Sequence, residues 1–210
     1  MKKVIKNLLF LGLLIVISIP LTAQAKEQLS SSKASCELMM AEQKLWIDHV
    51  LWTRNFIISD LSSLEDKEMV LDRLLQNQDD IGDSIKSYYG EEAGNQLSKL
   101  LREHIVLAGQ VVDAAKSGNK TDLEKYNKLW YQNADQIADF LSNANPNYSN
   151  KTLKDMLYTH LQLITDAVTA RLNKDWQADI IAYDKGEDHM VKFAKILVEG
   201  IITQFPEQFK

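Results

Sequence analysis

The chain contains very few residues that interrupt helices, and this limits the folds open to it more than any other feature. Only 3 Pro and 8 Gly occur in 210 residues, and Pro146 is the one proline between positions 37 and 204. Apolar residues recur over this stretch at three- and four-residue steps, the spacing of one face of an α-helix. No long run of alternating β-branched residues competes with this pattern. The sequence therefore predicts an all-α protein.

The apolar stripes and the turn residues divide the chain into about five to six helices. We expect helices over about 37–61, from about 66 to just before Gly90, from about 97 to 117, from about 121 to 141, from about 151 to 172, and from 176 towards 204. Residues 143–150 form a clear loop, whereas 173–175 are either a tight turn or a kink. Long helices joined by short connections predict an up-and-down antiparallel helical bundle.

The first 25 residues have the three parts of an export signal. Three lysines lie within the first six positions, residues 8–19 are apolar, and Ala23-Gln24-Ala25 is a small-x-small cleavage site. We predict a signal peptide at 1–25, cleaved after Ala25, and therefore a secreted or extracytoplasmic protein. The alternative is an uncleaved anchor. The apolar run is too short for a stable membrane span.

The mature chain is expected to be a polar tether followed by one domain. Residues 26–35 are polar and without periodicity, which is typical of a flexible tether, and residues 36–210 form the predicted bundle domain. This mature chain carries 21 basic and 29 acidic residues, a formal charge of −8, which argues against nucleic acid as a partner. The single Cys36 excludes disulfide bonds within the chain.

The four histidines of the chain fall one to a helix, each near the midpoint of its helix. They are His49, His104, His160 and His189. In an up-and-down bundle, mid-helix positions lie at similar heights whichever way each helix runs. The pattern predicts that at least three imidazoles meet in one buried layer, and Asn133 is the matching position on the fourth helix.

One interpretation of this layer is a metal centre. Imidazoles converging from several helices can hold a divalent transition metal. Neighbouring polar residues are possible supporting groups, either as ligands or as hydrogen-bond partners of ligands. These residues are Asp48, Glu103, Asn133, Asp184 and Asp188.

The second interpretation is a structural polar layer, in which each histidine forms hydrogen bonds within the core. The chain lacks Glu-x-x-His, His-x-x-x-His and His-Glu-x-x-His, the spacings found in known metal-binding bundles and zinc peptidases. It also lacks the Gly-x-Ser-x-Gly motif of hydrolases and the glycine-rich loops of nucleotide-binding proteins. We identify no catalytic residue.

Two arginines, Arg54 and Arg171, fall beside the apolar stripes. An arginine that faces the interior must be paired, because an unpaired buried charge is very costly. The alternative is that both are solvated at the surface. The candidate partners are Asp135, Asp139, Asp166 and Asp179.

These observations predict an exported, non-enzymatic helical-bundle protein that binds a metal ion or small ligand at the histidine layer. Two alternatives remain: a metal-dependent enzyme that uses the same centre, and a purely structural or protein-interaction bundle. The sequence leaves open which metal or ligand binds, and the oligomeric state.

Four segments carry a resemblance to known sequences. Residues 89–94 (YGEEAG), 100–105 (LLREHI), 130–138 (WYQNADQIA) and 200–206 (GIITQFP) are similar to a family of small all-helical proteins of Firmicutes. The resemblance covers most of the mature chain. That family has no established activity, so the resemblance implies a helical fold and assigns no site residue.

Overall fold

The computed structural model describes residues 32–210 and confirms the predicted all-α fold. No helix in this part of the chain is long and apolar enough to cross a membrane. The predicted signal peptide lies outside the described residues. The elements are α2 (Lys33–Leu61), α3 (Lys67–Ser84), the one-turn α4 (Lys86–Tyr89), α5 (Glu91–Ser117), α6 (Lys120–Ala144), α7 (Asn150–Leu172), α8 (Trp176–Gln204) and a terminal 3₁₀ turn, η1 (Pro206–Phe209).

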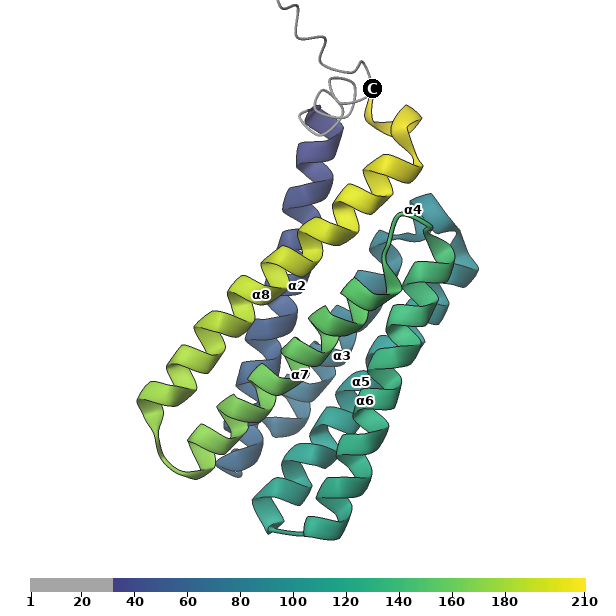
Figure 1. The fold of residues 1–210 in the computed structure, drawn as a ribbon. Coiled ribbons are helices and arrows are strands. Elements are labelled where there is room, and N and C mark those ends of the chain that lie inside the picture. Colours follow the sequence, from purple (N-terminus) through teal and green to yellow (C-terminus); the bar gives the residue numbers. More distant parts are fainter. Residues whose placement is uncertain (1–31) are drawn as a thin grey trace, which may run out of the picture.

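The six long helices form a closed ring around a common core (Figure 1). Each helix packs antiparallel against the next in the order α2, α3, α5, α6, α7 and α8, and α8 closes the ring against α2. The turns α2–α3, α5–α6 and α7–α8 lie at one end of the bundle. The α4 turn, the α6–α7 loop and η1 lie at the other end, next to the start of α2.

The helix starts differ from the sequence prediction at three positions, and the largest difference is in α5, which begins at Glu91 rather than at about 97. Ser32 caps α2, its side chain accepting a hydrogen bond from the Ser35 amide, so residues 33–35 of the predicted tether are helical and Ser35 is buried. α6 begins at Lys120 and is capped by Asn119, slightly before the expected start at about 121. Both caps are polar side chains that satisfy amides of the first turn, which is why the helices extend back to them.

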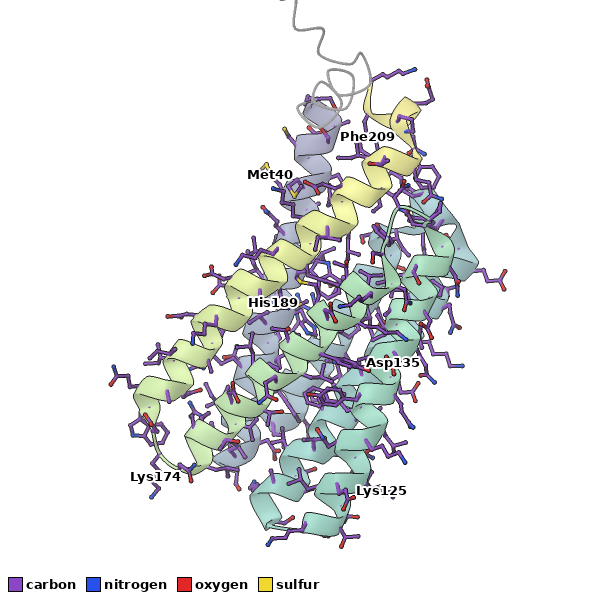
Figure 2. All side chains as sticks on the ribbon, viewed as in Figure 1. Met40, Lys125, Asp135, Lys174, His189 and Phe209 are labelled. Carbon is purple, nitrogen blue, oxygen red and sulfur yellow. The ribbon has the colours of Figure 1, made fainter. Side chains whose placement is uncertain are left out.

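The segment 173–175 is a tight turn between two helices and not a kink. Lys174 adopts a left-handed backbone conformation, φ 57°, and marks this end of the bundle in Figure 2. Asp175 then caps α8 by accepting a hydrogen bond from the Ala178 amide. The turn therefore reverses the chain and places α8 antiparallel to α7.

The two buried glycines of α8, Gly186 and Gly200, provide a matched test of packing. A Cβ on Gly200 would lie 1.9 Å from the Tyr148 ring, whereas a Cβ on Gly186 would have no neighbour within 4 Å. We expect Gly200→Ala to destabilise the fold by about 1–3 kcal/mol through overpacking. We expect Gly186→Ala to stabilise it by roughly 0.5–1 kcal/mol through helix propensity. Urea unfolding of both variants measures the difference, and equal effects would contradict this packing.

Candidate histidine layer

Three of the four histidines meet in the core at mid-height. His49 on α2, His104 on α5 and His160 on α7 are 2%, 4% and 3% exposed. The ring centroids of His49 and His160 are 5.4 Å apart, and those of His104 and His160 are 6.3 Å apart. The expectation that at least three imidazoles share one layer is therefore confirmed.

His104 belongs to a hydrogen-bond chain that uses both of its ring nitrogens. The indole N–H of Trp130 donates to His104 Nε2 at 3.1 Å, so that nitrogen must be the acceptor. The proton then lies on Nδ1, which donates to Asn133 Oδ1 at 2.7 Å. The Asn133 amide in turn donates to the Leu100 carbonyl at 3.1 Å. This fixes the tautomer of His104 and confirms that Asn133 faces the layer.

His49 and His160 form a pair that is only partly satisfied. Their Nε2 atoms face each other at 3.4 Å, longer than the usual 2.7–3.2 Å of an N–H donor. Neither Nδ1 atom has a hydrogen-bond partner within residues 32–210. Gln78 on α3 lies beside His49, and its Oε1 is likewise buried and without a partner in that range. The layer thus contains one closed network and one open pair.

Burial keeps the three core imidazoles neutral. It lowers the pKa of His49 to about 3, with a further contribution from His104, while the Gln78 side chain opposes the shift. Burial also lowers the pKa of His104 to about 4, against the effect of its Asn133 hydrogen bond. The pKa of His160 is lowered by burial first and then by the three other histidines. An uncharged imidazole keeps a lone pair, which is the form that binds metals.

His189 lies at the edge of the layer, about halfway along α8 (Figure 2). Its ring is half-buried, and Nε2 donates to the Met156 carbonyl at 2.8 Å. Because a carbonyl can only accept, Nε2 of this imidazole carries a proton. His189 is close enough to His160 to contribute to its lowered pKa.

The four acids considered as supporting groups do not enter the layer. Glu103, Asp184 and Asp188 are exposed. Asp48 is half-buried and pairs with Lys44 at 2.6 Å and Arg73 at 3.9 Å. Asp48, Glu103 and Asp188 each directly precede a histidine, and the roughly 100° rotation per residue carries them away from the core, whereas Asp184 lies five residues before His189.

Arg54 and Arg171 form a second buried polar cluster with Asp179. Both terminal nitrogens of Arg54 donate hydrogen bonds to the Asp179 carboxylate, at 2.9 and 3.0 Å. Arg171 donates a third hydrogen bond to the same carboxylate, at 2.7 Å. The Arg54 guanidinium also lies 4.6 Å from the centre of the Tyr183 ring. Of the four acids considered for these arginines, Asp179 is therefore the partner. The cluster ties α2, α7 and α8 together.

The polar side chains of the core that the sequence analysis missed include Glu42, Gln78 and the indole of Trp130. Glu42 is 2% exposed and lies two turns before His49, so it falls on the same face of α2. The seven-residue spacing from His49 could have predicted this burial, because residues two turns apart lie on the same face of a helix. Trp130 is buried in the core, but its hydrogen bond to His104 depends on how α5 and α6 meet.

Within residues 32–210, no group of three or more His, Cys, Asp or Glu side chains is arranged to hold a metal ion. Comparison of the chain with models of protein families, with curated proteins and with solved structures finds no match. The resemblance to small helical proteins of Firmicutes therefore stays a prediction.

Proposed function

We propose that the protein is an exported, non-enzymatic helical bundle whose open histidine pair, His49 and His160, binds one transition-metal ion. The separation of the two Nε2 atoms, 3.4 Å, carries the proposal. Two imidazoles on a tetrahedral metal with bonds of 2.0–2.1 Å have nitrogens about 3.3–3.4 Å apart. The pair therefore has the spacing of two ligands of one ion and is long for a hydrogen bond.

The surroundings of the pair support this assignment. A metal-bound imidazole coordinates through one nitrogen and usually donates a hydrogen bond from the other. Gln78 Oε1, buried beside His49 and without a partner in the described chain, is the candidate acceptor for the His49 Nδ1 proton. No third His, Cys, Asp or Glu side chain of the described residues joins the pair, so this proposal has two protein ligands. In this proposal His104 is no ligand, because Trp130 and Asn133 occupy both its nitrogens.

Burial favours a binding role over catalysis. A catalytic metal keeps an open position that substrate reaches, whereas the rings of His49 and His160 are 2% and 3% exposed. The competing candidate is a purely structural layer, favoured by the closed network of His104. A metal-binding pair and a structural layer are both compatible with an exported, non-enzymatic bundle. They differ in whether the purified protein retains a metal ion.

The test is metal analysis of untagged mature protein refolded with Zn²⁺ or Co²⁺ and then dialysed. We expect about one ion per chain, visible-region absorption from bound Co²⁺, and a melting temperature that falls when EDTA removes the ion. His49→Gln and His160→Gln should each lose the ion, and Trp130→Phe, which opens only the His104 network, should retain it. Wild-type protein that folds but binds neither ion would overturn the metal site and leave the structural bundle.

A further inference from the structure

The histidine pair has no acidic side chain beside it. Within residues 32–210, no Asp, Glu or Cys joins His49 and His160 in a group that could hold a metal ion. Glu103 and Asp188 are exposed, and Asp48 forms ion pairs with basic side chains at the surface of the bundle. The protein therefore provides no counter-charge for an ion bound between the two rings.

Burial makes the charge of such an ion decisive. The rings of His49 and His160 are 2% and 3% exposed, so bulk water does not reach them to screen a charge. Glu42, the nearest buried acid on α2, precedes His49 by two turns, about 10 Å along the helix axis. The cost of transferring an ion from water to the core rises with the square of its charge. A monovalent ion is therefore favoured over a divalent one.

The number of ligands favours the same kind of ion. Zn²⁺ in structural sites of proteins is almost always bound by four ligands, and the pair supplies two. Copper binds imidazole well, and Cu(I), with its filled d shell, forms stable complexes with two imidazole nitrogens in a nearly linear arrangement. A linear unit requires the two Nε2 atoms to move slightly further apart. The rings are free to do so, because neither Nδ1 atom is held by a hydrogen bond within the described chain.

We propose that the pair of His49 and His160 binds Cu(I) in preference to divalent metal ions. This inference rests on the proposed metal site and names its ion. The two Nε2 atoms are the ligands, and Cu(I) brings a single charge into the core. The Trp46 ring, whose centre lies 5.8 Å from that of His49, helps to exclude the additional ligands that a divalent ion requires.

The test is a competition between Co²⁺ and Cu(I) in untagged mature protein under anaerobic conditions. Cys36 is an exposed thiol and would itself bind Cu(I), so every protein in the test carries Cys36→Ser. The protein is first loaded with Co²⁺, and Cu(I) is then added. We expect about one equivalent of Cu(I) to abolish the visible absorption of bound Co²⁺. Competition with the Cu(I) chelator bicinchoninate then measures the affinity.

Two kinds of histidine variant locate the bound copper. His49→Gln and His160→Gln should each lose tight binding of Cu(I). The matched control is His189→Gln, which changes the half-buried histidine that donates to the Met156 carbonyl, and it should retain Cu(I). Equal affinity for Cu(I) in His49→Gln and in the parent protein would overturn the proposal, because the copper would then be bound elsewhere.

A further variant tests the charge argument while both histidines stay in place. Gln78 is fully buried beside His49, and Gln78→Glu replaces its amide by a carboxylate of nearly the same shape. The new carboxylate can offset one charge of a divalent ion. We expect the preference for Cu(I) over Co²⁺ to fall by at least about tenfold. An unchanged preference in folded Gln78→Glu would contradict the role of charge.

Failure of this inference is distinguishable from failure of the metal site. Co²⁺ that stays bound in the presence of excess Cu(I) would overturn the preference for Cu(I) and leave the metal site in place. Folded protein that binds neither Co²⁺ nor Cu(I) would overturn both.

Discussion

Lowering the pH from 7 to 5 is expected to destabilise the metal-free protein by about 4 kcal/mol through His49 and His104 alone. Their pKa values in the folded state are about 3 and about 4, against roughly 6.5 in an unfolded chain. Between these limits the unfolded state binds more protons than the folded state. The stabilisation from neutral, buried imidazole is therefore complete above pH 6.5 and is lost as the pH falls below that value.

Glu42 acts in the opposite direction and must be separated from the histidines. Because its pKa is raised in the folded state, its contribution to stability is present below its unfolded pKa and is lost as the pH rises above it. Urea unfolding at pH 5, 6 and 7 in a Glu42→Gln background isolates the histidines. His49→Gln in that background should remove about half of the pH dependence. Equal stability at pH 5 and 7 would contradict the neutral, buried state of these rings.

Asp179→Asn is expected to destabilise the protein by about 3 kcal/mol, because it leaves two arginines without their shared carboxylate. The Asp179 side chain is 3% exposed, and those of Arg54 and Arg171 are 20% and 15% exposed. Breaking a buried ion pair costs about 3–5 kcal/mol of stability. We expect the lower end of this range, because both guanidinium groups are partly exposed to solvent.

The matched control is Asp184→Asn, an exposed acid on the same helix, which should change stability by less than about 0.5 kcal/mol. Combining Asp179→Asn with Arg171→Met removes one stranded charge and should recover part of the loss. Urea unfolding at pH 7 measures all three variants. If Asp179→Asn were as stable as Asp184→Asn, the cluster would contribute nothing to holding α2, α7 and α8 together.

The polar groups of the core would make different contributions to such a protein. The His104 network is closed, since every nitrogen has a partner, and it suits a role in fixing how α5 and α6 pack. The His49–His160 pair and the Glu42 carboxyl group each keep buried polar atoms without partners in the described chain. Because unsatisfied buried groups are costly, the histidine pair is where we expect a ligand, and the metal analysis above tests it.

The helical fold and the height of the histidines could be predicted from the sequence by itself. The scarcity of proline and glycine, together with the three- and four-residue spacing of apolar residues, predicts long helices. An antiparallel bundle then sets mid-helix residues level with one another, which is why His49, His104 and His160 meet as expected. Capping was harder to predict, because Asn119 and Thr121 are both good caps, and local sequence does not choose between them.

The chemistry of the layer was decided by the tertiary structure. Asp48 and His49 are neighbours in sequence, yet the helix turns one outwards to Lys44 and the other into the core, so adjacency did not make the acid a partner. Trp130 and Asn133 take both nitrogens of His104 only because α5 and α6 pack at that height, and Asp179 reaches Arg54 only because α8 closes the ring against α2. Periodicity states which face of a helix is buried, but the partner across the core depends on the rotation and neighbours of every helix, which no single segment encodes.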